Sequence, residues 1–121
     1  MATPLGGLRT LIFPAPDLDA ATSWWSDYLG YGPYFDEPFY VGFDVAGYEL
    51  GLVPDAESAD GATAYWAVDD VALAIVAATD LGASVREEAH DVGDGIVVGS
   101  VRTPQGSVVG FIRNPHFAAT A

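Results

Sequence analysis

The sequence predicts an α+β fold made of two tandem βαβββ modules, whose strands form a curved mixed sheet around a central cavity. Landmarks of the first half return in the second at a nearly constant separation. The pairs are Thr10 and Thr63, Asp17 and Asp70, and Gly30 and Gly82, which lie 53, 53 and 52 residues apart. Such a period indicates two copies of one supersecondary unit packed on each other. With 121 residues, we expect a single domain over 1–121, with modules at about 7–54 and 63–117 joined by a linker at 55–62.

In the first half, the apolar and β-branched run Leu8–Phe13 ends before a proline and predicts a strand. Asp17 or Asp19 is placed to cap a helix that Gly30 ends. Trp24 and Trp25 lie in this helix, and at least one should pack on the sheet. The remaining expected elements are an edge strand and loop within 31–38 and a hairpin of strands 40–45 and 48–53.

The second half repeats this order. The expected elements are a strand over 63–68, a helix over 71–81 that stops at Gly82, a short strand over 84–88, a loop over 90–95, and a hairpin of strands 96–102 and 107–113. Helices on one face of a curved sheet would complete the α+β arrangement.

Composition limits the possible functions. No apolar stretch approaches the roughly 20 residues of a membrane span, and the first residues do not resemble a signal peptide, so we expect a cytoplasmic protein without membrane contacts. The absence of cysteine excludes disulfides and thiolate chemistry. A net charge of −13 makes nucleic acid an unsuitable partner. The acidity either attracts a cationic ligand or reflects a surface tuned for solubility.

The chain resembles the vicinal oxygen chelate superfamily, which includes glyoxalase I, bleomycin resistance proteins and extradiol dioxygenases. The resemblance extends from about Leu8 to Phe117. The matching segments are Asp17-Leu18…Ala21…Trp24-Trp25…Leu29-Gly30, Val68-Asp69-Asp70-Val71, and Thr103-Pro104-Gln105-Gly106. The resemblance implies paired βαβββ modules around a cavity, and often a homodimer.

In metal-dependent members of this superfamily, the first and last strands of each module carry the metal ligands. The corresponding positions here are Thr10, Gly51, Thr63 and Gly110. Divalent metals need deprotonated nitrogen or oxygen ligands, which glycine lacks and threonine supplies poorly. We therefore predict no metal at these positions and no cofactor.

Strand alternation then predicts which side chains face the cavity. The predicted inward set is Leu8, Ile12, Glu49, Val53, Tyr65, Ala67, Val108 and Ile112, with the two last-strand glycines leaving space. The set predicted to face the helices is Leu11, Phe13, Leu50, Leu52, Trp66, Val109 and Phe111. The predicted ligand-binding residues are Thr10, Ile12, Tyr34, Phe35, Phe39, Phe43, Glu49, Gly51, Thr63, Tyr65 and Gly110, with Tyr40 as a further aromatic neighbour.

Glu49 is either a counter-charge or general base in the cavity, or a solvent-facing carboxylate on a hairpin. The aromatic residues form either a stacking box around a ligand or ordinary core and edge packing. His90 and His116, the only histidines, either have surface roles or contribute to a relocated metal site.

Three functions follow from these alternatives. The first is a metal-independent protein that binds a flat or cationic small molecule, such as an aromatic cation, for drug or metabolite sequestration in the style of bleomycin resistance proteins. The second is a lyase or isomerase that uses Glu49 with Tyr65, or a relocated metal. The third is a structural or regulatory module with a filled cavity. For each we expect a symmetric homodimer, with the segment 31–43 at its interface or at the lip of the cavity.

Overall fold

Each half of the chain folds as the sequence repeat predicts, into one strand, one helix and three further strands. The computed structural model describes residues 5–56 and 58–116. The first module contains β1 (Leu8–Pro14), α1 (Leu18–Leu29), β2 (Phe35–Glu37), β3 (Tyr40–Val45) and β4 (Tyr48–Val53). The second contains β5 (Thr63–Ala67), α2 (Val71–Asp80), β6 (Ser84–Asp91), β7 (Val97–Arg102) and β8 (Val108–Arg113). A short 3₁₀ helix, Ser58–Asp60, lies in the predicted linker.

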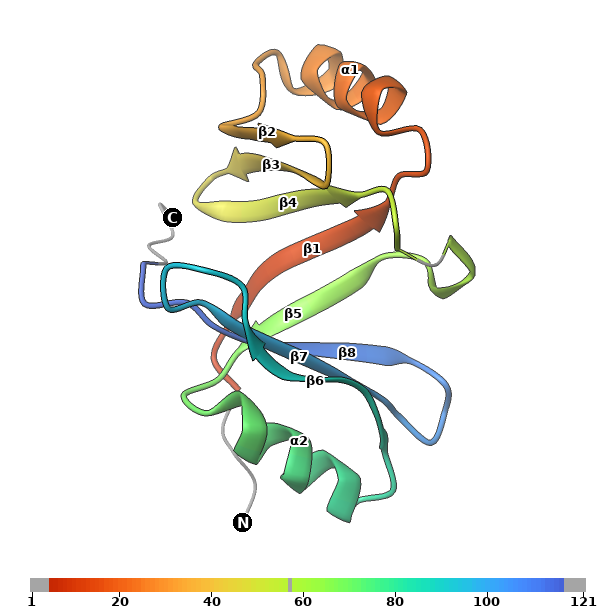
Figure 1. The fold of residues 1–121 in the computed structure, drawn as a ribbon, viewed down its shortest axis with the longest axis vertical. Coiled ribbons are helices and arrows are strands. Elements are labelled where there is room, and N and C mark those ends of the chain that lie inside the picture. The colour runs from red at the N-terminus through yellow and green to blue at the C-terminus, as the bar shows by residue number, and fades with distance from the viewer. Residues whose placement is uncertain (1–4, 57, 117–121) are drawn as a thin grey trace. The chain divides into compact units, whose positions relative to one another are not determined.

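The two modules have the same sheet topology (Figure 1). In the first module the strand order is β2-β3-β4-β1, and in the second it is β6-β7-β8-β5. The first strand of each module runs parallel to the last, and the other neighbours are antiparallel. This shared topology confirms the predicted fold class of tandem βαβββ modules.

The division into two compact units falls within β1. Residues up to Arg9 group with the second module, and the first unit begins at Thr10. The backbone amide of Gly6 donates to the carbonyl of Ala67 at 2.7 Å, and the amide of Ala67 donates to the carbonyl of Gly7 at 3.0 Å. These hydrogen bonds extend the second module by a short segment from the start of the chain.

Aspartates begin both helices; Asp17 was one of the two predicted caps of the first helix, and Asp70 takes the same role in the second. The side chain of Asp17 accepts a hydrogen bond from the amide of Ala20 at 3.1 Å, and that of Asp70 accepts from Leu73 at 3.0 Å. Gly30 ends α1 with a φ of 85°, in the left-handed region that favours glycine.

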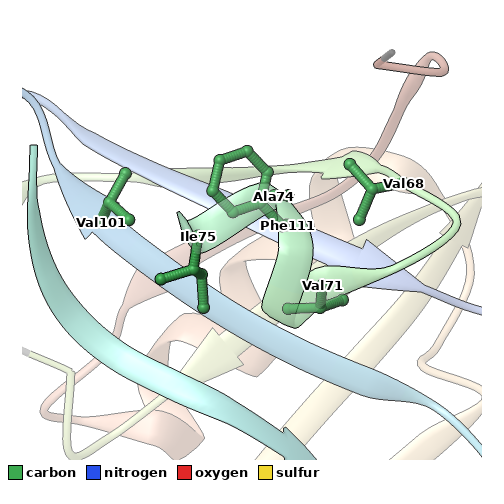
Figure 2. Close-up of a cluster of buried hydrophobic side chains, with 6 residues drawn as sticks. All are labelled: Val68, Val71, Ala74, Ile75, Val101 and Phe111. Atoms are coloured by element: carbon green, nitrogen blue, oxygen red, sulfur yellow. The ribbon is translucent and has the colours of Figure 1, made fainter. Parts of the chain in front are cut away.

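Each helix covers one face of the sheet of its own module. In the first module Leu18, Ala21 and Trp25 of α1 pack on a core of Ala15, Val41, Phe43 and Leu52. In the second module α2 contributes Val71, Ala74 and Ile75 to a core that also contains Val68, Val101 and Phe111 (Figure 2). Trp25 is therefore the tryptophan that packs on the sheet, while Trp24 is 58% exposed.

The predicted helix-facing set is confirmed at five positions, Phe13, Leu50, Leu52, Val109 and Phe111. Leu11 and Trp66 are half-buried and belong to neither core cluster of the described residues. The opposite face of each sheet carries the polar side chains described below.

Two boundaries differ from the sequence prediction. The edge strand β2 has only three residues, and β6 continues to Asp91, so His90 lies on a strand and not in the predicted loop. Pairing of His90 with Val98 and of Asp91 with Val97 extends β6. Local sequence does not encode this extension, because the hydrogen-bonding partners lie on the following strand. Within the described residues, neither helix is long and apolar enough to cross a membrane.

Candidate ligand-binding site

The face of the first-module sheet opposite α1 presents one carboxylate between two tyrosines. Glu49 lies on β4 and is half-buried. Its Oε1 accepts a hydrogen bond from the hydroxyl of Tyr34, and its Oε2 accepts one from the hydroxyl of Tyr40. Since Leu50 and Leu52 pack toward α1, alternation places Glu49 on the other face. Glu49 therefore lies on the sheet face away from α1.

Glycines make room for this arrangement. A Cβ atom at Gly42 would lie 2.8 Å from Oε2 of Glu49 and 3.1 Å from the Tyr40 ring. At Gly51 it would lie 2.5 Å from Cδ1 of Ile12 and 2.8 Å from Cζ of Tyr40. The expectation that Gly51 leaves open space is therefore wrong, because the Tyr40 ring and Ile12 lie over its backbone. Gly51 permits close packing of a tyrosine that holds Glu49.

Two phenylalanine rings join this group through Tyr40. Phe35 contacts Phe39 and Tyr40, with ring centroids 6.1 and 6.0 Å apart. Phe35 is 39% exposed and Phe39 64%, so their faces are accessible to a ligand. We call Glu49, Tyr34, Tyr40, Phe35 and Phe39 the Glu49 cluster.

The inclusion of Phe43 among the ligand-binding residues is wrong. Phe43 is fully buried in the core under α1. It pairs with Leu50 across β3 and β4 and therefore shares the helix-facing side, whereas Gly42 pairs with Gly51 on the opposite side. The sequence positions of Phe35, Phe39 and Phe43 alone do not reveal that Phe43 faces α1.

The hydroxyl of Tyr34 keeps its proton and acts as a hydrogen-bond donor. Desolvation, and then the hydrogen bond to Glu49, raise the pKa of Tyr34 well above its ordinary value of 10, and the negative charges of Glu49 and Asp44 act in the same direction. Tyr34 therefore remains protonated at neutral pH and continues to donate to the carboxylate.

The second module carries a second carboxylate cluster that strand alternation did not reveal. Glu87 on β6 accepts hydrogen bonds at Oε1 from the hydroxyl of Tyr65 at 3.1 Å and from that of Ser100 at 3.2 Å. Ser100 is completely buried and also accepts from Nη1 of Arg86 at 3.2 Å. Burial, and then the charge of Glu87 and its hydrogen bond, raise the pKa of Tyr65 to about 12, against the opposing effect of Arg86.

A distortion of β6 explains why the sequence did not predict Glu87 as a site residue. Register shifts flank Glu87 on both sides, between Val85 and Glu87 and between Glu87 and His90. In a regular strand, neighbours such as Arg86 and Glu87 point to opposite faces, yet both reach the hydroxyl of Ser100. β-Bulges redirect side chains in this way and are frequent next to functional sites.

In the second module, too, a tyrosine ring occupies the space beside the glycine of the last strand. A Cβ atom at Gly110 would lie 2.6 Å from Cγ of Tyr65, so this ring covers the backbone as Tyr40 covers Gly51. Thr10 and Thr63 on the first strands are buried, with 8% and 6% exposure. Among residues 5–56 and 58–116, no group of three histidines, aspartates or glutamates is arranged to hold a metal ion.

Both histidines are on the surface. The Nδ1–H of His90 donates to the carbonyl of Glu88 at 2.8 Å, and its Nε2 lies 3.6 Å from Oε2 of Glu87. His116 donates from Nε2 to the carbonyl of Asp94 at 2.9 Å. The structure thus groups Tyr34, Phe35, Phe39 and Tyr40 with Glu49 in one module and Tyr65 with Glu87 in the other.

Comparison with known proteins supports the fold assignment. No protein-family model and no curated protein sequence matches the chain. Solved structures do match, among them a hypothetical protein from Bacillus halodurans (TM-score 0.72, 12% identity, 92% of this chain and 96% of the other). Methylmalonyl-CoA epimerase from Streptomyces coelicolor, in a complex with 2-nitronate-propionyl-CoA, matches with a TM-score of 0.69 and 15% identity over 96% and 99% of the two chains.

A third match is a glyoxalase/bleomycin resistance protein/dioxygenase superfamily member from Vibrio splendidus (TM-score 0.60, 18% identity, 88% and 97% coverage). The resemblance to the vicinal oxygen chelate superfamily is thereby confirmed at the level of the fold. At these identities the likeness concerns the fold alone, and function has to be argued from the residues of this chain.

Proposed function

We propose that this chain is a metal-independent small-molecule-binding protein of the glyoxalase/bleomycin-resistance type, which sequesters a planar cationic drug or metabolite. The observation that carries the proposal is the Glu49 cluster: a half-buried carboxylate held by two tyrosine hydroxyls, one of which, that of Tyr40, belongs to a ring in contact with the partly exposed Phe35. Each carboxylate oxygen has two lone pairs, so Glu49 retains acceptor capacity for the N–H groups of a ligand.

Charge and ring geometry select the ligand class. A cation near Glu49 gains from the carboxylate and from the faces of Phe35, Phe39 and Tyr34, whereas an anion is repelled by Glu49 and by the net charge of −13. A flat aromatic ligand can stack on the exposed rings. Neither interaction requires a metal, an acid or a base.

The packing over the glycines supports independence from metal. In the metal-dependent relatives that the sequence resembles, the last strand of each module supplies a ligand. Here the corresponding glycines lie under Tyr40 and Tyr65, so a ligand side chain at either position would displace a tyrosine that holds a carboxylate.

The alternative is a lyase or isomerase that uses Glu49 as a base. A general base needs an oxygen directed at the substrate proton. The two residues predicted for this alternative are not paired with each other, since Glu49 accepts from Tyr34 and Tyr40 whereas Tyr65 donates to Glu87. A protein that only binds would show saturable affinity without consumption of the ligand.

The test compares Glu49→Gln with the wild type in fluorescence titrations with a planar cationic dye, acridine orange, and an anionic one, fluorescein. We expect acridine orange to bind in preference to fluorescein and the substitution to weaken it roughly tenfold, since a charged hydrogen bond is worth about 1.5–3 kcal/mol. Folding should be nearly unchanged, because the glutamine carbonyl still accepts from one tyrosine.

Glu88→Gln is the matched control. It removes the same charge from an exposed side chain on β6. Preferential binding of fluorescein, or equal effects of the two substitutions, would refute the proposal.

A further inference from the structure

Thr10 is a buried polar residue whose hydroxyl has no hydrogen-bonding partner in the part of the chain that the structure describes. It lies on β1 and is 8% exposed. No hydrogen bond within residues 5–56 and 58–116 involves its Oγ1 atom. Ser100, another buried hydroxyl, is by contrast paired with both Glu87 and Arg86. Buried polar groups are paired in most proteins, so the hydroxyl of Thr10 needs a specific explanation.

Strand register places this hydroxyl next to Glu49. Thr10 and Glu49 are Cα partners in the parallel pair of β1 and β4, and neighbouring strands lie about 4.8 Å apart. Further along β1, Phe13 packs under α1, whereas Cδ1 of Ile12 lies over Gly51 on the opposite face. Because side chains alternate along a strand, Thr10 shares the face of Ile12 and therefore that of Glu49.

An unpaired hydroxyl at this position destabilises the protein without ligand. A hydroxyl that leaves water without gaining a new hydrogen bond raises the free energy of the folded state, and valine has nearly the same shape without this cost. A polar group that lowers stability is typical of a functional site. We therefore expect the partner of the Thr10 hydroxyl to arrive with a ligand.

We propose that Thr10 is a specificity-determining residue, which exchanges a hydrogen bond with a polar group that the ligand carries beside its cationic centre. The inference rests on the proposed function: Glu49 holds the positive charge, and Thr10 recognises a substituent about one strand spacing away. It narrows the ligand class from planar cations in general to planar cations with a carbonyl, amide or hydroxyl group near the charge. A site built around such a hydrogen bond discriminates against analogues that lack the partner.

The test compares two planar cations of equal charge, N-methylpyridinium and the N-methylnicotinamide cation, which differ only by a ring carboxamide. Titrations of the full-length protein are followed by NMR of the backbone amides. We expect the wild type to bind the carboxamide compound roughly five- to tenfold more tightly, which corresponds to one neutral hydrogen bond. Thr10→Val should abolish this preference and leave the affinity for N-methylpyridinium unchanged. Thr10→Ser retains the hydroxyl and should keep most of the preference.

Thermal unfolding without ligand gives a measurement that is independent of the proposed function. Thr10→Val should raise the melting temperature by a few degrees, because it removes an unpaired buried hydroxyl. Thr22→Val is the matched control in the same compact unit. The Oγ1 atom of Thr22 donates to the carbonyl of Leu18 at 2.7 Å, so this substitution should not raise the melting temperature and should leave both affinities unchanged.

The possible negative results are distinguishable. If the wild type binds the two cations equally, or if Thr10→Val weakens both equally, Thr10 does not select the ligand and the inference is wrong, while Glu49 stands as the cation site. If Thr10→Val lowers the melting temperature of the protein without ligand, its hydroxyl has a partner in the folded chain and the inference is again wrong. If neither cation binds, the proposed function fails and this inference fails with it.

Discussion

Replacement of Gly110 by alanine tests the packing of the Tyr65 ring against the backbone of β8. The added methyl group would lie 2.6 Å from Cγ and 2.7 Å from Cε2 of Tyr65, which is too close for unstrained contact. The ring must move, and with it the hydroxyl that donates to Glu87 at 3.1 Å.

Two costs contribute to the expected destabilisation. Overpacking of a well-packed site costs about 1–3 kcal/mol, and the disrupted hydrogen bond adds about 1 kcal/mol. We therefore expect Gly110→Ala to lower the free energy of unfolding by about 2–4 kcal/mol. For a domain of this size the melting temperature should fall by roughly 6–12 °C.

The assay is urea and thermal unfolding followed by circular dichroism, with Gly32→Ala as the matched control. A Cβ atom at Gly32 has no atom within 4 Å, and its backbone is not in the left-handed region, so this control should have a stability close to that of the wild type. In a double-mutant cycle with Tyr65→Ala, the cost of the added methyl should largely disappear once the ring is removed. If Gly110→Ala is as stable as Gly32→Ala, or its cost is unchanged without the ring, the packing argument is wrong.

Three further predictions concern ionisation, metals and assembly. The pKa of Tyr65 is raised from 10 to about 12, so its contribution to the free energy of unfolding should be complete below pH 10 and should decrease between pH 10 and 12. Measured by urea unfolding at a series of pH values, the free energy of unfolding should therefore decline less steeply at alkaline pH in Tyr65→Phe than in the wild type. Zinc, nickel and manganese should leave the melting temperature unchanged in thermal-shift titrations, and a concentration-dependent rise would contradict metal independence. For the expected symmetric dimer, analytical ultracentrifugation should give the mass of two chains, and a monomer at micromolar concentration would contradict this expectation.

The sequence by itself determined the fold, because the information that specifies it is local and duplicated. The helix caps Asp17 and Asp70 act within one turn of the helices that they begin, and Gly30 acts on its own backbone dihedral angles. Period-two alternation also placed Glu49 on the face away from α1, since β4 is a regular strand without a register shift. These features require no knowledge of contacts distant in the sequence.

Tertiary structure decided the contents of the candidate sites. Gly51 and Gly110 suggested empty space, but only the packing shows that Tyr40 and Tyr65 fill it. Phe43 was predicted to bind ligand because it is close in sequence to the other aromatic residues. The prediction was wrong because the β3–β4 register pairs Phe43 with Leu50, which faces α1.

Glu87 was missed for a different physical reason. The register shifts that direct it toward Ser100 arise from the pairing of β6 with β7, and no residue of β6 alone marks them. Likewise, Tyr65 and Glu87 lie 22 positions apart in the chain, and they meet because β5 pairs with β8, β8 with β7 and β7 with β6. Local propensity and alternation therefore specify the strands and helices, whereas long-range strand pairing determines which charged side chains meet.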